Sequence, residues 1–90
     1  MSLKRILVVD DEPNMRRVLS AVLRKDGYEV VAASSGEEAL KHFRAEGFHA
    51  VITDLKMPGM SGLDLLSKVA ATNSSIPVIL VTAYGTIDTA

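Results

Sequence analysis

Three short aliphatic runs dominate this chain, and each ends in a side chain that carries oxygen. The runs are RILVVD at residues 5–10, HAVITD at 49–54 and PVILVT at 77–82. Nearly continuous Val and Ile residues over this length are typical of strands that are buried on both faces of a parallel sheet. A weaker run, YEVVAA at 28–33, indicates a fourth strand nearer an edge of the sheet.

Helical patterns separate these runs. The first places apolar residues at spacings of three and four, begins at Pro13 and ends before Gly27. Two more helices are predicted, one after Ser35 with Glu38 three residues on, and one after Ser61. Because consecutive parallel strands need a helix to return the chain, this alternation predicts an α/β fold with right-handed crossovers.

Acidic residues follow two of the predicted strands. Asp10 and Asp11 come after the first strand, Asp54 ends the run at 49–54, and Thr82 ends the run at 77–82. Since the carboxyl ends of parallel strands lie at one edge of a sheet, we expect these side chains to meet. Three carboxylates at close range repel one another unless a cation lies among them, and oxygen ligands without nearby His or Cys favour Mg²⁺.

A carboxylate beside Mg²⁺ can attack a phosphoryl group and form an acyl phosphate, while a threonine hydroxyl binds a phosphoryl oxygen. The alternative is that the acids only cap helices, and Asp11 could cap the helix that begins at Pro13. One acid would need no further explanation. Three acids at one edge of the sheet indicate a phospho-aspartate site.

Composition limits the other functions. Ten Lys and Arg residues against eleven Asp and Glu residues give a formal net charge of −1, which gives no reason to expect nucleic-acid binding by this segment. The chain has no Cys, so disulfides and thiolate metal sites are excluded. No apolar run approaches the roughly 20 residues that a bilayer span needs, and no signal peptide is evident. We expect one cytoplasmic domain without membrane contact.

The segments VVDDE, VITDLKMPGMSGLDLL and PVILVTAYG together resemble the receiver domain of two-component response regulators. The resemblance implies a flavodoxin-like (CheY-like), doubly wound parallel sheet with strand order 2-1-3-4. It also implies a phosphoacceptor module that acts on itself only and is not a turnover enzyme. The wording TAYGTIDTA is further similar to receivers of bacterial activators that serve the nitrogen-type alternative sigma factor, sigma-54.

The resemblance assigns a role to each candidate residue. Asp54 would take the phosphoryl group from a sensor histidine kinase, which would dock beside the helix that begins at Pro13. Mg²⁺ would be the cofactor, and the residues expected to bind it are Asp11, Asp54, Lys56 through its backbone carbonyl, and Asp10 through water. Thr82 would be the switch hydroxyl, and Ala83 the small residue that leaves room for the phosphoryl group. Phosphorylation would then change the region from Thr82 to Ala90 and control an output domain, for which DNA binding is one option.

The resemblance covers residues 1–90 as one receiver domain that stops at the start of the family's fourth helix. The family's fifth strand, its fifth helix and its phosphoryl-binding lysine have no counterpart here. Without a fifth strand, the run from Pro77 to Thr82 would be an exposed apolar edge through which two chains could dimerise or swap strands. We therefore expect either a fragment or an edge that another chain covers.

Two other functions remain open. A pseudo-receiver that only binds proteins would have the same fold without the phosphorylation. A hydrolase with an aspartyl-phosphate intermediate needs a second acid two positions after its nucleophile, whereas Lys56 stands two positions after Asp54.

Overall fold

As far as residue 81, strands and helices alternate along the chain in the predicted order. The computed structural model describes residues 4–55 and 59–81 and the backbone of residues 87–89. Its elements are β1 (Arg5–Val9), α1 (Pro13–Lys25), β2 (Glu29–Ala33), α2 (Gly36–Ala45), β3 (Ala50–Asp54), α3 (Gly62–Thr72), β4 (Val78–Val81) and β5 (Ile87–Thr89). None of the helices in these segments has the length and apolar character needed to cross a bilayer.

The ends of α1 follow from its sequence. Pro13 occupies the first turn, where its missing N–H costs nothing. At the other end Gly27 has a φ of 94°, a conformation that residues with a Cβ rarely adopt. The N–H of Gly27 donates to the carbonyl of Arg24 at 3.0 Å, and that of Tyr28 donates to the carbonyl of Leu23 at 3.1 Å. This pair of hydrogen bonds is a Schellman motif, which turns the chain into β2.

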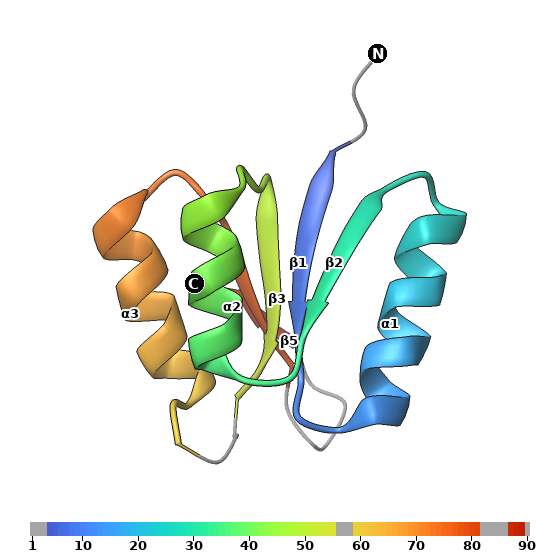
Figure 1. Cartoon of the computed structure of the whole chain (residues 1–90), viewed down its shortest axis with the longest axis horizontal. Coiled ribbons are helices and arrows are strands. Elements are labelled where there is room, and N and C mark those ends of the chain that lie inside the picture. The colour runs from blue at the N-terminus through green and yellow to red at the C-terminus, as the bar shows by residue number, and fades with distance from the viewer. Residues whose placement is uncertain (1–3, 56–58, 82–86, 90) are drawn as a thin grey trace.

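The sheet has the order β2-β1-β3-β4-β5, and its first four strands are parallel. The predicted order 2-1-3-4 is therefore confirmed. Helices α2 and α3 cover one face of the sheet, and α1 covers the other (Figure 1). In this arrangement the chain leaves β1 and β3 at the same end of the molecule, so the residues that follow the two strands are neighbours.

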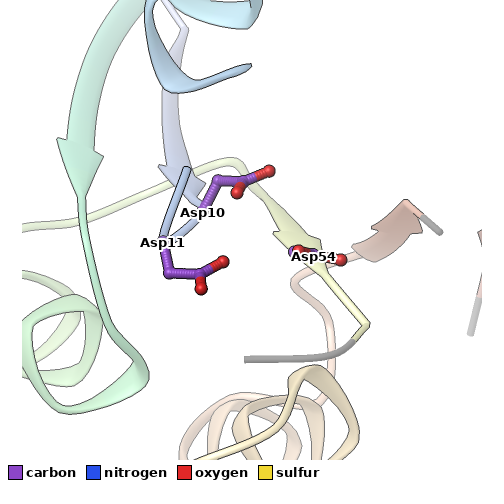
Figure 2. Close-up of side chains that lie close together, drawn as sticks. All are labelled: Asp10, Asp11 and Asp54. Carbon is purple, nitrogen blue, oxygen red and sulfur yellow. The ribbon is translucent and has the colours of Figure 1, made fainter. Parts of the chain in front are cut away.

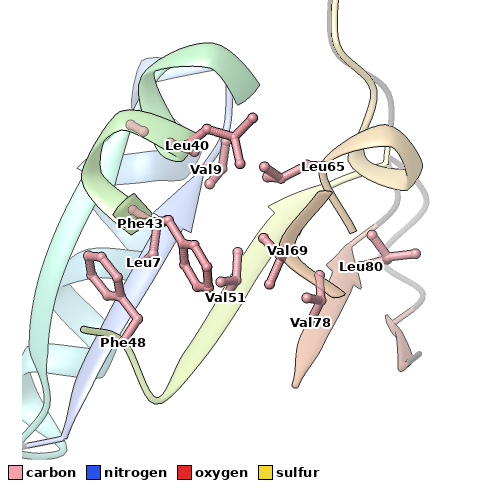
Figure 3. Packing of buried hydrophobic residues seen from close by; sticks show 12 residues of the cluster. Leu7, Val9, Leu40, Phe43, Phe48, Val51, Leu65, Val69, Val78 and Leu80 are labelled. Carbon is pink, nitrogen blue, oxygen red and sulfur yellow. The ribbon is translucent and has the colours of Figure 1, made fainter. Parts of the chain in front are cut away.

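Alternate residues of the central strands pack on opposite faces. Leu7 and Val9 of β1 join the main core beneath α2 and α3, which also contains Phe43 and Leu65 (Figure 3). Ile6 and Val8 face α1 and form a smaller cluster. Leu7 and Val8 are both fully buried, which explains why β1 is apolar without interruption.

The outer edge of β4 is not exposed as the sequence suggested. Strand β5 pairs with it in antiparallel fashion, with Val81 opposite Ile87 and Ile79 opposite Thr89. The prediction of an open edge is therefore wrong for residues 79–81, where β5 takes the place that a strand of a second chain was expected to fill. Residues 87–89 form a strand where the resemblance placed the loop or first turn of a fourth helix, because these residues satisfy main-chain groups of β4 and two of them are β-branched.

Candidate metal centre

Three carboxylates meet at the carboxyl end of the sheet, as the strand endings predict. Asp10 directly follows β1, Asp11 comes next, and Asp54 is the last residue of β3. One carboxylate oxygen from each residue lies within 4.8 Å of those from the other two. Figure 2 shows the three side chains gathered at this end of the strands. The convergence on which the predicted site depends is therefore present, and it joins residues from two separate strands.

The three acids differ in their exposure. Asp10 is only 4% exposed, Asp54 is partly buried, and Asp11 is exposed. The Oδ1 atom of Asp10 accepts a hydrogen bond from the N–H of Glu12 at 2.8 Å, and the N–H of Asp10 donates to the carbonyl of Ala33 at 3.1 Å. These bonds fix Asp10 at the base of the cluster, while Asp11 faces solvent.

The environment of Asp10 raises the pKa of its carboxyl group. Burial is the largest cause, and the negative charges of Asp54 and Asp11 raise the pKa further. The hydrogen bond from the Glu12 N–H and the charge of Arg16 act in the opposite direction. The contributions that raise the pKa outweigh those that lower it, so the protein disfavours the charged form of Asp10. A cation in the cluster would stabilise that charged form.

Arg16 is a part of this site that the sequence did not reveal. One of its guanidinium nitrogens donates to the backbone carbonyl of Asp10 at 2.7 Å. This bond fastens the first part of α1 to the end of β1. The spacing of residues along a helix cannot show that a long side chain such as that of Arg16 folds back toward the preceding strand.

The capping alternative for Asp11 is not what the structure shows. The N-cap of α1 is Glu12, whose side chain accepts a hydrogen bond from the N–H of Asn14 at 3.3 Å. Asp11 therefore lies outside the helix, and capping does not account for its place beside Asp10 and Asp54.

The loop that follows Asp54 returns close to the strand. The N–H of Gly62 donates to the carbonyl of Leu55 at 3.0 Å. A Cβ at Gly62 would collide with the backbone oxygen of Asp54, so no larger residue fits without a shift of the main chain. Gly59 has a φ of 77°, which also favours glycine. The backbone therefore favours glycine at both positions, through close approach to Asp54 at Gly62 and through a positive φ at Gly59.

Three predicted site residues, Lys56, Thr82 and Ala83, lie outside the described residues. Their immediate neighbours are in place, since Asp54 pairs with Val81 across β3 and β4 and the N–H of Leu55 donates to the carbonyl of Val81 at 3.0 Å. The roles assigned to the three residues stay predictions.

The donor set of the cluster fits a hard divalent cation. In the described residues the cluster consists of carboxylates alone, without the imidazole or thiolate ligands that would favour a softer metal. Two of the acids are at least partly open to solvent, which leaves room for further oxygen ligands.

Comparisons with known proteins agree with this geometry. Residues 6–90 match the family model of the response regulator receiver domain. The transcriptional regulatory protein ZraR of Escherichia coli is 42% identical over 85 residues, which cover 94% of this chain and 19% of that protein. The chain therefore spans about a fifth of the length of this curated relative.

Solved structures give the same result. The response regulator protein TrrA of Thermotoga maritima, in complex with Mg²⁺-BeF, superposes with a TM-score of 0.87 at 48% identity, and the match covers 91% of this chain and 71% of that chain. A complex of TrrA with the histidine kinase ThkA matches with a TM-score of 0.86 at 46% identity over 93% and 72% of the two chains. The chain belongs to the response regulator receiver domain family.

Proposed function

We propose that this chain accepts a phosphoryl group on Asp54 in the presence of Mg²⁺ and works as the receiver part of a longer response regulator. The observation that carries the proposal is the convergence of Asp10, Asp11 and Asp54 within 4.8 Å at the end of the sheet. Mg²⁺ bound to TrrA, a structural relative, supports the choice of cation.

Asp54 is the proposed nucleophile. One of its carboxylate oxygens would attack the phosphorus of a phosphohistidine, so that an O–P bond forms, the N–P bond breaks, and the histidine nitrogen leaves with its electron pair and takes up a proton. Asp54 suits this role because it is partly exposed, whereas Asp10 is buried and held by a backbone N–H. The reaction modifies the protein itself.

Asp10 and Asp11 are the proposed acidic partners of the metal. Asp11 and Asp54 would bind Mg²⁺ directly, Asp10 would act through water, and the backbone carbonyl of Lys56 would complete the protein ligands. Mg²⁺ would neutralise the clustered carboxylates and the charge of the incoming phosphoryl group. Thr82 and Ala83 follow Val81, which pairs with Asp54, and this register supports their proposed contact with the phosphoryl group.

A sensor histidine kinase is the proposed phosphoryl donor, and the complex of TrrA with ThkA supports this class of partner. We place its docking surface beside α1. Three apolar side chains of α1 remain largely exposed, namely Met15 at 41%, Val18 at 56% and Val22 at 54%. They share one face of the helix and would be covered by a helical partner.

The output of the proposed switch is transcriptional. ZraR is named a transcriptional regulatory protein, and the chain matches only 19% of it, which supports an output domain elsewhere in a longer protein. Changes from Thr82 to Ala90 would carry the signal to that domain. The sigma-54 type of activator remains the form that the sequence favours.

The test is incubation of the chain with Mg²⁺ and acetyl phosphate, followed by intact-protein mass spectrometry. We expect the mass of one phosphoryl group on the wild type and none on Asp54→Asn. Asp26→Asn, which removes an exposed acid at the end of α1, is the matched control and should react normally. Beryllofluoride with Mg²⁺ should shift the amide resonances around Asp54 in an independent experiment.

Two outcomes would contradict the proposal. Incorporation into Asp54→Asn would remove Asp54 from the role of nucleophile. A wild type that neither incorporates a phosphoryl group nor responds to beryllofluoride would instead support the pseudo-receiver function.

A further inference from the structure

A groove of about 360 Å³ runs between α1 and β2, the outermost strand on that side of the sheet. Figure 1 shows α1 beside this edge strand. The side chains that give the groove its character are Arg16, Arg17, Ser20, Ala21, Arg24 and Ala32. Among the described residues, its lining has three guanidinium groups and no carboxylate, so its charge is opposite to that of the acidic cluster.

Main-chain carbonyls hold two of the arginines in place. Arg16 donates to the carbonyl of Asp10 at 2.7 Å, and Arg24 donates to the carbonyl of Val30 at 3.2 Å. A guanidinium carries five N–H donors in a planar fork, so one such bond orients the group and leaves donors for a ligand. The groove is therefore partly organised in advance.

The three arginines are not equally available to an anion in the groove. The charge of Arg16 lowers the pKa of both Asp10 and Glu38, which shows that its field is shared with these two carboxylates. Arg17 is exposed, and Arg24 lies about two turns further along α1 than Arg16. Arg17 and Arg24 are thus the cations on which a bound anion would chiefly depend.

Ser20 supplies the second observation. It is only 4% exposed, and its Oγ makes no hydrogen bond within the part of the chain that the structure describes. A buried hydroxyl without a partner lowers stability, and alanine would fill the same place at no such cost. The Oγ is covered in the ligand-free chain, so a ligand oxygen in the groove would complete its hydrogen bonding after the short side chain rotates about χ1 toward the groove.

We propose that this groove binds the phosphate group of a small phosphorylated molecule. Planar guanidinium forks and a hydroxyl match the oxygens of a phosphate, and the methyl groups of Ala21 and Ala32 leave space beside them. The volume suits a small organic ligand. A nucleic-acid backbone fits less well, because the chain has a net charge of −1 and the acidic cluster lies at the same end of α1 as Arg16.

The experiment is a titration of isotope-labelled chain, free of Mg²⁺, with inorganic phosphate and with phenyl phosphate, followed through amide resonances. Sodium chloride at equal ionic strength is the reference. We expect saturable shifts at Ser20, Ala21 and Ala32. The double variant Arg17→Ala/Arg24→Ala should weaken the apparent affinity by about tenfold or more. Arg44→Ala, which removes an exposed arginine from the last turn of α2, should leave the affinity unchanged.

Ser20→Ala separates a binding role from a folding role. We expect it to weaken phosphate binding while the urea midpoint stays the same or rises, because the variant loses an unsatisfied hydroxyl. Equal shifts with chloride, or undiminished affinity in the double variant, would overturn the proposal. Tighter binding of a short DNA duplex than of phenyl phosphate, through the same arginines, would assign the groove to nucleic acid instead. Since inorganic phosphate does not phosphorylate Asp54, a negative result here leaves the proposed phosphoryl transfer untouched.

Discussion

Asp10→Asn should make the metal-free chain more stable while it impairs the proposed metal site. The substitution keeps a side-chain oxygen that can accept the hydrogen bond from the Glu12 N–H, so the local backbone needs no change. It removes a buried negative charge that lies within 4.8 Å of two others. The variant therefore isolates the electrostatic cost of the cluster.

The size of the effect follows from Coulomb's law. At 4.8 Å, two unit charges repel by about 0.9 kcal/mol in water and by about 3.5 kcal/mol at an effective dielectric constant of about 20. Asp11 is exposed and Asp54 partly exposed, so screening favours the lower figure for each pair. We expect Asp10→Asn to raise the free energy of unfolding by about 1–2 kcal/mol at pH 7 without metal.

The gain in stability from Asp10→Asn should depend on pH in a defined direction. The pKa of Asp10 is raised in the folded chain above its ordinary value of 3.8, so between these two values the folded state binds more protons than the unfolded state. The stability of the wild type therefore falls as pH rises through this window. Below the ordinary pKa both proteins are uncharged at this position, and their difference should vanish.

Urea unfolding in EDTA at several pH values measures this difference. Asp26→Asn is the control for loss of an acid outside the cluster and should change stability by less than about 0.5 kcal/mol. With Mg²⁺ added, the wild type should gain stability and Asp10→Asn should gain less. An Asp10→Asn protein that is less stable than the wild type at pH 7 in EDTA would refute the reasoning, since repulsion among the three carboxylates would then be outweighed by interactions that the charged Asp10 makes.

Two further predictions concern the β3–α3 connection. Gly62→Ala should destabilise the chain by about 1–3 kcal/mol and slow phosphorylation, because the new Cβ meets the backbone of Asp54. The control in urea unfolding is Gly47→Ala, because a Cβ at Gly47 would have no atom within 4 Å. Equal stability of the two alanine variants would contradict the close approach. Ser61→Ala should cost about 1 kcal/mol through loss of the capping box with Asp64, whereas Ser67→Ala, on the exposed side of α3, should cost nothing by the same measurement. A neutral Ser61→Ala would show that the capping box contributes little.

Much of the fold could be predicted because it depends on three features that the sequence shows: continuous aliphatic runs, helical spacing of apolar residues, and the alternation of the two that requires parallel strands. Continuous aliphatic runs identified the buried strands, and Ser35 and Ser61 marked helix starts that the structure confirms. Parallel strands share the direction of their carboxyl ends, so Asp10 and Asp54 had to approach each other once β1 and β3 were neighbours. These inferences need only the backbone.

The features that escaped prediction depend on side-chain conformation or on very short segments. Arg16 reaches the carbonyl of Asp10 through a long flexible side chain, and Ser20 lies in a helix pattern that gives no reason to expect a buried hydroxyl. Strand β5 has three residues, too few to show a period of two. Asp11 was the acid weighed as a cap of α1, whereas the N-cap is Glu12; the sequence does not separate them, since either acid could accept a hydrogen bond at the start of the helix.

The opposed charges on α1 and at the end of β1 explain how a buried acid is tolerated at the site. Burying Asp10 among other carboxylates disfavours its charged form, and the chain offsets part of that cost with the Glu12 N–H and the positive charge of Arg16. The remaining repulsion is not removed by any group that the structure describes around Asp10. A divalent cation bound in the cluster would relieve this repulsion. The free energy by which the repulsion lowers the stability of the metal-free fold would then contribute to the affinity for the cation. The repulsion within the cluster and the proposed affinity for a cation are therefore one electrostatic quantity, and a variant that relieves the first should weaken the second.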